Sequence, residues 1–236
     1  MWERRIARAE ELAKTCPPAA ELLTFYARLA ALQKSIFEEL ATTPQTDPVC
    51  VTQYYPRLQA VAGAIANLSG AALEPLLAAH WNHEPEPDDR ARFVARALLQ
   101  PFAEALAARG SPARDSSSGT CPFCGARPLA SILRGEGEGG KRFLVCSLCS
   151  TEWEFRRVLC PQCEEEQKDR LPIYSTQEFD HIRIEACDSC HGYLKRIDLT
   201  RSGLAIVPAD ELASVALNVW AEDHGYSKIE PNLLGL

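Results

Sequence analysis

Four Cys-x-x-Cys pairs follow one another in the second half of this 236-residue chain. Two residues between the cysteines allow a tight turn to aim both sulfurs at one point, and the amides of that turn can hydrogen-bond the thiolates. Two such turns that face each other make a tetrahedral cage of four sulfurs, a geometry that selects zinc or iron. The pairs are Cys121/Cys124, Cys146/Cys149, Cys160/Cys163 and Cys187/Cys190.

The spacing between the pairs predicts how they combine. Long, short and long gaps of 21, 10 and 23 residues separate successive pairs. This alternation indicates two modules, each with two pairs joined by a hairpin-sized insertion, and therefore two metal ions per chain. A redox dithiol usually occurs once, at a helix N-terminus after a strand, so four copies favour metal binding over reactive dithiols or disulfides. The predicted ligands are Cys121, Cys124, Cys146 and Cys149 in the first module and Cys160, Cys163, Cys187 and Cys190 in the second.

The ligand type leaves the identity of the metal open. A closed four-thiolate zinc site only supports structure, whereas iron in the same cage can cycle between its ferrous and ferric states. Cysteine thiolates also hold iron–sulfur clusters. Two paired modules make one metal ion per module the simpler interpretation.

The elements that must position these cysteines differ from the rest of the chain in composition. Residues 1–109 carry apolar stripes at three- and four-residue steps and many Ala residues, which predicts a helical domain. Residues 110–120 are rich in Gly and Ser, which predicts a flexible linker and a domain boundary. Residues 121–207 then form a tandem metal domain with two four-cysteine sites, and residues 208–236 form a C-terminal helix, expected to reach residue 224, and a tail.

The metal domain contains short runs that are typical of strands. Residues 142–145, 153–158 and 181–184 are rich in β-branched and aromatic side chains, and residues 135–140 are a glycine-rich hairpin loop. The sequence therefore predicts an α+β fold: a helical domain, two rubredoxin- or zinc-ribbon-like modules and a C-terminal helix.

Charge and hydropathy restrict the partners. The net charge of −7 and the pI of about 5.3 argue against general electrostatic binding to nucleic acid or an anionic membrane, although they do not exclude a local basic patch. Residues 121–200 hold 11 Lys and Arg against 13 Asp and Glu, whereas ribbons that bind nucleic acid carry clustered Lys and Arg. No run of about 18 apolar residues occurs, so we expect no membrane insertion.

The first residues indicate the compartment. Met1 to Ile6 lead into Glu10 and Glu11 without the apolar segment of a secretory signal, so we expect a cytoplasmic protein. A reducing cytoplasm disfavours structural disulfides, which agrees with metal binding by the cysteines.

Motifs for catalysis are missing from the sequence. It has no glycine-rich phosphate loop, nucleophile elbow or His-Glu-x-x-His motif, so we predict that the chain is not an enzyme. His181 and His191 could add a ligand or carry protons, but four cysteines already complete each module.

The cysteine region resembles the formate dehydrogenase accessory proteins, the FdhE family. The segments that carry the resemblance are Cys121-Pro-Phe-Cys-Gly-Ala-Arg-Pro, Cys146-Ser-Leu-Cys-Ser-Thr-Glu-Trp153, Arg157-Val-Leu-Cys160-Pro-Gln-Cys163, Cys187-Asp-Ser-Cys190-His-Gly-Tyr193-Leu-Lys195 and Ala209-Asp-Glu-Leu-Ala-Ser-Val-Ala-Leu217. The resemblance implies a cytoplasmic, non-enzymatic maturation factor that binds the catalytic subunit of a molybdenum- or tungsten-dependent formate dehydrogenase. It also implies two rubredoxin-like modules that bind iron through the eight cysteines, and a tendency to form a homodimer.

Two other functions agree with paired four-cysteine modules. A rubredoxin-like electron carrier or redox sensor would need iron and a reversible potential. A nucleic-acid-binding zinc ribbon is disfavoured by the acidic balance of residues 121–200.

Overall fold

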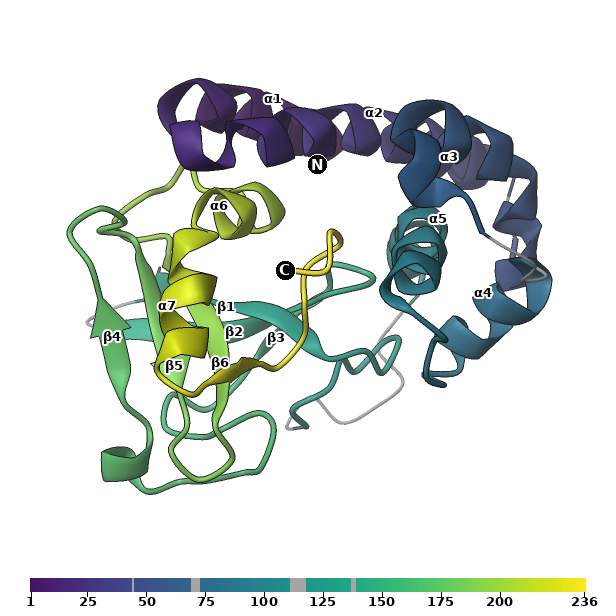
Figure 1. Cartoon of the computed structure of the whole chain (residues 1–236). Coiled ribbons are helices and arrows are strands. Elements are labelled where there is room, and N and C mark those ends of the chain that lie inside the picture. The colour runs from purple at the N-terminus through teal and green to yellow at the C-terminus, as the bar shows by residue number, and fades with distance from the viewer. Residues whose placement is uncertain (44, 69–72, 111–117, 137–138) are drawn as a thin grey trace.

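Helices make up the first part of the chain in the computed structural model, which describes residues 1–43, 45–68, 73–110, 118–136 and 139–236 (Figure 1). Three short 3-10 segments connect them, at Pro17–Ala19, Pro48–Tyr54 and Gly63–Ala66. The prediction that the N-terminal region is helical is therefore confirmed. The helices are α1 (Trp2–Thr15), α2 (Ala20–Thr42), α3 (Tyr55–Ala62), α4 (Leu73–Trp81) and α5 (Asp89–Ala107).

Local sequence explains where these helices begin and end. Pro17 stands in the first turn of the 3-10 segment after α1, where proline is tolerated, and separates α1 from α2. The Asp88 side chain accepts a hydrogen bond from the Ala91 amide at 2.7 Å and caps the start of α5. Pro101 lies inside α5, and the helix continues past it to Ala107. None of the helices in the described residues is both long and apolar enough to cross a membrane.

One mixed sheet holds the cysteine pairs. Its strand order is β3-β2-β1-β6-β5-β4, and β7 pairs with β6. The antiparallel pairs β1–β2 and β5–β6 are joined by parallel pairing of β1 with β6, from Ala130↔Lys195 to Leu133↔Asp198. The two predicted modules therefore share one continuous sheet. Its strands are β1 (Pro128–Glu136), β2 (Gly139–Cys146), β3 (Glu152–Glu154), β4 (Ile173–Ser175), β5 (Ile182–Ala186), β6 (Gly192–Asp198) and β7 (Ser227–Lys228).

The strand expected at residues 153–158 is shorter in the structure. β3 ends at Glu154 because the chain then turns around the buried Arg142 side chain. The Arg142 guanidinium donates to the carbonyl oxygens of Arg156 at 2.9 Å and Leu159 at 3.1 Å, which removes these residues from strand pairing.

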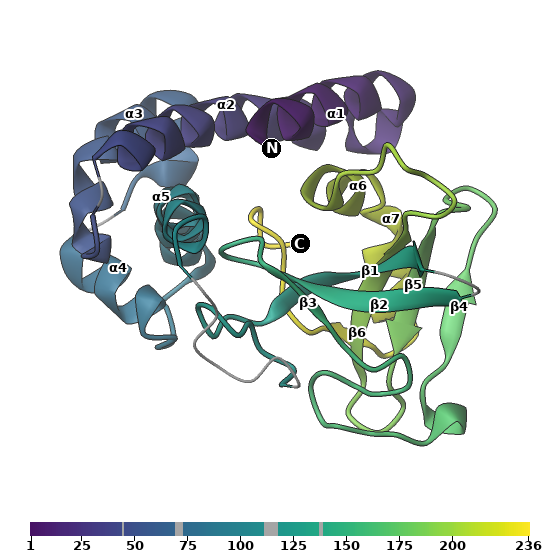
Figure 2. The same ribbon diagram turned by 180° about the vertical axis from the view of Figure 1, so that it is seen from behind.

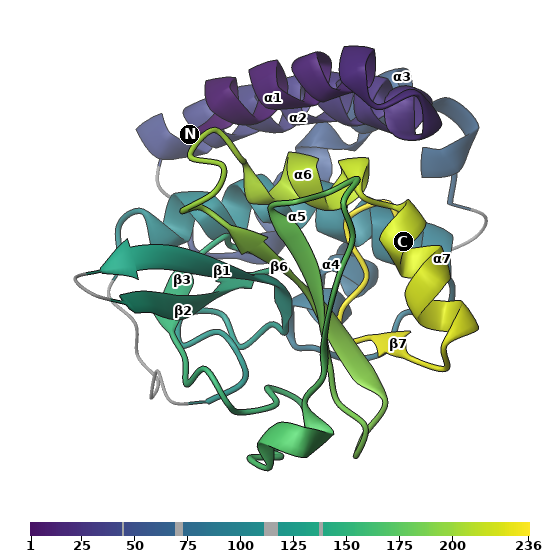
Figure 3. The same ribbon diagram turned by 90° about the vertical axis from the view of Figure 1, so that its left-hand side faces the viewer.

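The helix predicted over residues 209–224 is two helices, α6 (Val207–Ala213) and α7 (Ala216–Asp223). Pro208 lies in the first turn of α6, as expected. The ammonium group of the buried Lys195 donates to the carbonyl oxygens of Glu211 and Ser214, at 2.8 and 2.9 Å, and so satisfies carbonyl groups at the C-terminal end of α6. Helix α7 then continues beside β5 and β6 (Figure 3).

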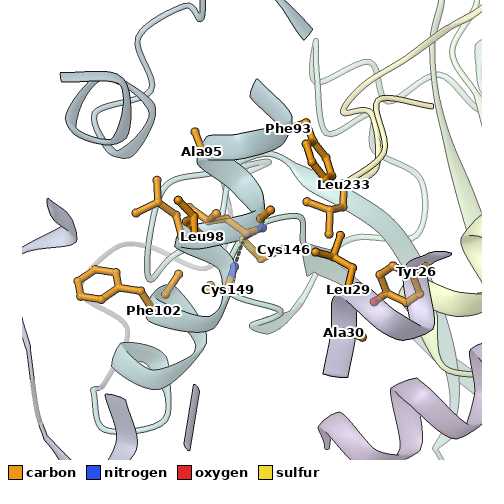
Figure 4. Close-up of a cluster of buried hydrophobic side chains, with 14 of the residues drawn as sticks. Tyr26, Leu29, Ala30, Phe93, Ala95, Leu98, Phe102, Cys146, Cys149 and Leu233 are labelled. Atoms are coloured by element: carbon orange, nitrogen blue, oxygen red, sulfur yellow. Dashed lines mark hydrogen bonds between the residues drawn. The ribbon is translucent and has the colours of Figure 1, made fainter. Parts of the chain in front are cut away.

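The largest of three buried hydrophobic clusters in the described residues joins the helices to the sheet. Leu29 of α2 and Leu98 of α5 belong to the same buried cluster as Leu144 of β2 and Leu194 of β6. Figure 4 shows side chains of α2 and α5 gathered around two of the cysteines. The chain on either side of residues 110–120 is therefore packed together. Residues 111–117 of the predicted linker and residues 137–138 of the predicted glycine-rich loop lie outside the described residues.

Candidate metal centres

Site 1 consists of Cys121, Cys124, Cys146 and Cys149, whose sulfur atoms all lie within 4.8 Å of one another. Cys121 and Cys124 precede β1, and Cys146 ends β2, so the β1–β2 hairpin brings the two pairs face to face. The Cys121 and Cys149 sulfurs are 3.5 Å apart, and those of Cys124 and Cys146 are 3.4 Å apart.

Site 2 consists of Cys160, Cys163, Cys187 and Cys190, and its sulfurs meet the same 4.8 Å limit. Cys187 and Cys190 lie in the turn between β5 and β6. The Cys160 and Cys190 sulfurs are 3.7 Å apart, and those of Cys163 and Cys187 are 3.6 Å apart. The structure thus groups the eight cysteines into the two predicted sets of four.

These separations fit a tetrahedral metal centre. A metal–sulfur bond of about 2.3 Å places the sulfurs of a tetrahedral site about 3.8 Å apart. The sulfur–sulfur distances of 3.4 to 3.7 Å in the two sites are close to this value. They are far longer than the disulfide bond length of about 2.05 Å. Each set of four thiol groups could therefore hold one metal ion.

The turns that carry the cysteines repeat one backbone design. In the described residues, one residue with positive φ directly follows the second cysteine of every pair: Gly125 (+83°), Ser150 (+55°), Glu164 (+61°) and His191 (+55°). This conformation reverses the chain after the second sulfur, and only Gly125 adopts it without strain. His191 thus has a backbone role beside site 2, and its ring lies 6.3 Å from that of Tyr226.

Backbone amides within the turns point at sulfur. The Leu148 and Cys149 amides donate to the Cys146 sulfur at 3.3 and 3.4 Å in site 1. In site 2 the Gln162 amide donates to the Cys160 sulfur at 3.4 Å. Such bonds disperse the charge of a thiolate and fix the direction of its lone pairs, so the turns are preorganised to bind a cation.

The thiol groups in each set perturb one another's ionisation. Burial raises the pKa of Cys146, while hydrogen bonds from Cys124 and Cys146 lower the pKa of Cys121. In site 2, burial raises the pKa of Cys160 to about 11. Four adjacent thiolates repel one another, so full deprotonation of either set needs a bound cation.

Site 1 is enclosed and site 2 is more open. Cys121, Cys146 and Cys149 are at most 3% exposed, and the Gln100 side chain of α5 donates to the Ser147 carbonyl oxygen at 2.9 Å. In site 2, Cys163 is exposed. The turn between β5 and β6 lies at the end of the sheet that points away from α1 and α2 (Figures 1 and 2).

Arg96 is a functional candidate that sequence reasoning missed. It lies on α5 and is 2% exposed, and its Nη1 atom donates to the carbonyl oxygens of Pro231 at 2.7 Å and Asn232 at 3.1 Å. Burial lowers its pKa, whereas the charges of Glu230 and Cys146 act in the opposite direction. The signal in the sequence is an arginine inside the apolar stripe of this helix, between Phe93 and Phe102 in the same buried face.

The histidines singled out in the sequence are not grouped with the sulfurs. His181 Nε2 lies 3.1 Å from Asp210 Oδ1, and Arg8 Nη2 donates to the same carboxylate oxygen at 2.7 Å. This contact joins α1, α6 and the start of β5.

Comparison with known proteins shows which family models match the chain. A family model described as "FdhE, central domain" matches residues 120–157, and one described as "FdhE, C-terminal domain" matches residues 158–234. The boundary between the two models falls between site 1 and site 2.

Curated proteins and a solved structure match as well. The chain is 37% identical to "Protein FdhE homolog" of Aquifex aeolicus over 150 residues, which cover 63% of this chain and 53% of that protein. It is 39% identical to "Protein FdhE homolog" of Pseudomonas aeruginosa over 133 residues, 53% of this chain and 42% of that one. The matches thus span about half of the curated relatives' length. The crystal structure of the FdhE protein from Pseudomonas aeruginosa covers 99% of this chain and 95% of its own, with a TM-score of 0.70 and 26% identity.

Proposed function

We propose that this chain, which belongs to the FdhE family, is a cytoplasmic assembly factor that binds the catalytic subunit of a formate dehydrogenase and acts by binding rather than catalysis. The observation that supports this best is the pair of four-sulfur groups in a fold that matches the FdhE crystal structure over nearly the whole chain. The core that the helices and the sheet share holds these two parts of the chain against each other.

Each four-cysteine group holds one metal ion in this proposal. Iron is favoured by the family resemblance, and zinc fits the same donor set. A bound ion would cross-link the two cysteine turns of its site and, if it is iron, could exchange one electron. The chain's own part is to fix the turns, donate amide hydrogens to sulfur and, at site 1, exclude water.

Co-expression with a formate dehydrogenase catalytic subunit tests the proposal. The tagged chain should recover the subunit, and Cys146→Ser should recover much less because it opens site 1. Cys16→Ser is the matched control, since Cys16 lies outside both sites and is only partly buried. Failure of the wild-type chain to recover the subunit, or equal recovery by Cys146→Ser, would contradict the proposal.

A second candidate function, electron transfer, is favoured by the exposure of Cys163. An exposed sulfur ligand gives a partner direct access to a redox-active ion. Metal analysis and the visible spectrum of the chain purified anaerobically from its own host decide between the two. Two irons with thiolate-to-iron bands and a reversible potential support a redox role, and two zincs without colour exclude it.

The resemblance also implies a homodimer. Light scattering on the eluted peak of a size-exclusion column gives the mass directly. About twice the 26.0 kDa of one chain is the expected result, and a mass of one chain contradicts it.

A further inference from the structure

Strand β4 is an edge of the sheet and, within the described residues, pairs only with β5 (Figure 1). In an antiparallel pair, every second residue turns both its N–H and its C=O group toward the neighbouring strand. The Ala186 amide donates to the Pro172 carbonyl oxygen at 3.0 Å, so Pro172 and then Tyr174 face β5. The backbone groups of Ile173 and Ser175 therefore point away from the sheet, where another strand can pair with them.

Apolar surface accompanies this free edge. Ile173 is 50% exposed, and Val219 on the neighbouring helix α7 is 57% exposed. A groove of about 550 Å³ runs between β4 and α7, and Tyr174, Leu217 and Trp220 are among the residues that line it. An unpaired strand edge next to exposed apolar side chains is typical of a surface that another chain covers.

The charges on the two sides of β4 are arranged symmetrically around Tyr174, with opposite signs. Arg170 stands four residues before Tyr174, and Glu178 stands four residues after it. Lys168 stands six residues before Tyr174, and Asp180 stands six residues after it. The four charged side chains are exposed. Each basic residue thus has an acidic counterpart at the same distance on the other side of the strand.

These charges are available to a partner. Residues 168–170, which include one Asp, carry a net charge of +1, and residues 178–180 carry −2. Neither Arg170 nor Glu178 has an ion pair within 4.0 Å among the described residues. A hydrogen bond from a serine hydroxyl is the main cause of the lowered pKa of Glu165, and the charge of Arg170 adds a smaller effect from a distance.

A second copy of this chain fits both patterns. In an antiparallel pair of β4 strands with a two-fold axis at Tyr174, Ile173 of one copy lies opposite Ser175 of the second copy. The outward N–H and C=O groups of each strand then meet those of the other. The same axis brings Arg170 of one copy to the side of Glu178 of the second copy, twice per dimer. A parallel pair would instead bring like charges together.

We propose that β4 is the dimer interface of this chain and pairs antiparallel with β4 of a second copy. The inference rests on the homodimer in the proposed function. It adds the surface that the two copies share, their relative orientation and the charges that select it.

A charge swap tests the interface and its direction. Glu178→Lys and Arg170→Glu each place like charges together at both ends of the paired strands. Each single variant should therefore raise the dimer dissociation constant about tenfold or more, as measured by sedimentation. The double variant Arg170→Glu/Glu178→Lys restores opposite charges and should return the constant to within about threefold of wild type. Glu10→Lys, an equal reversal on an exposed position of α1, should dimerise like wild type.

A backbone variant tests the strand pairing itself. Ser175→Pro removes an outward N–H group, and edge strands tolerate proline where that group faces solvent. Circular dichroism and metal content should therefore equal those of wild type, while light scattering should give the mass of one chain. Ser175→Ala keeps the N–H group and should remain a dimer. If Ser175→Pro alters the fold, the charge swap still decides the question.

Three outcomes would overturn the inference. They are a dimer that both single charge reversals leave intact, a double variant no stronger than the single variants, and a folded Ser175→Pro chain that remains a dimer. In each case the homodimer stands and its interface lies elsewhere. Wild type with the mass of one chain contradicts the homodimer as well.

Recovery of the catalytic subunit is a separate result. If the variants dissociate as expected but wild type does not recover the subunit, the interface stands and the proposed client is wrong.

Discussion

Site 1 and site 2 each bring four cysteine thiols together, but their surroundings differ. Site 1 lies within the core that α2 and α5 share with the sheet, whereas site 2 lies at the far end of the β5–β6 hairpin with Cys163 exposed. The local turns are alike, since each is followed by one residue with positive φ. Ligand spacing thus sets the geometry of a site, and the packing around it sets what else depends on that site.

This difference has an energetic consequence. Thiolate ligands assemble only when the chain folds, so the free energy of metal binding is also free energy of folding. At site 1 that free energy supports the hairpin, the Gln100 contact to Ser147 and the packing of α5. At site 2 it supports a hairpin end with fewer buried contacts, which can open locally while the rest stays folded.

Opening site 1 should have the largest effect. We expect Cys146→Ser to lower the free energy of unfolding by about 5 kcal/mol and the metal content from two ions to one. Guanidinium unfolding followed by far-ultraviolet circular dichroism measures the loss in the helices. The control Cys16→Ser should leave the free energy of unfolding and the metal content nearly unchanged. If the helices of Cys146→Ser unfold at the same guanidinium concentration as those of wild type, the two sites do not differ in the way described.

The buried pair of Lys195 and Glu211 fastens β6 to α6 without a metal. Both side chains are 0% exposed, and Lys195 Nζ lies 3.0 Å from Glu211 Oε1. Burial lowers the pKa of Lys195 to about 8, and Glu211 is the charge that opposes this shift. Glu211→Gln leaves an uncompensated buried charge and should cost about 3 kcal/mol, with two metal ions still bound.

Glu222→Gln is the matched control for that variant, because Glu222 is exposed on α7. Denaturant unfolding and metal analysis on both variants provide the comparison. Loss of either ion in Glu211→Gln would mean that the contact between β6 and α6 and the metal sites are not independent.

Opening site 2 should have a smaller effect. We expect Cys163→Ser to lose one metal ion and to lower the free energy of unfolding by only about 1–2 kcal/mol. Amide hydrogen exchange should show faster exchange in the β5–β6 turn and unchanged protection in α5. Faster exchange in α5 would show that site 2 also supports the helices.

The contact between His181 and Asp210 should have the smallest effect, and it depends on pH. The hydrogen bond to Asp210 raises the pKa of His181, so its contribution to stability is complete below the ordinary pKa of about 6.5. It is lost as pH rises through the higher pKa of the folded state. Between pH 6 and 8, the free energy of unfolding should therefore fall more for wild type than for His181→Gln. The difference between the two decreases should be below about 1 kcal/mol.

Thermal unfolding at several pH values measures this difference. His224→Gln, at the exposed C-terminal end of α7, should follow the wild-type profile. A His181→Gln profile that matches wild type would show that the contact does not fasten the start of β5 to α1 and α6.

Local and non-local features differ in how far the sequence predicts them. The grouping of the cysteines follows from spacing along the chain, because the β1–β2 hairpin lies between the two pairs of site 1 and the paired strands β4 and β5 lie between the two pairs of site 2. The parallel pairing of β1 with β6 joins residues about 65 positions apart, such as Ala130 and Lys195, and no local pattern encodes it.

Side chains from distant segments explain the other differences. The apolar stripe over residues 209–224 is compatible with one helix, and the division after Ala213 coincides with contacts from Lys195 on β6. The burial of site 1 against α5 depends in the same way on packing between segments far apart, which periodicity does not show. The sequence predicted which four cysteines come together in each site, and tertiary packing made the two sites different.

Metal release from the fully loaded chain tests this difference most directly. A chromogenic chelator in excess should remove the two ions in two phases of equal amplitude, the faster from site 2 and the slower from site 1. The fast phase should be absent from Cys163→Ser and the slow phase from Cys146→Ser. A single phase for both ions, or a fast phase that disappears in Cys146→Ser, would contradict the account.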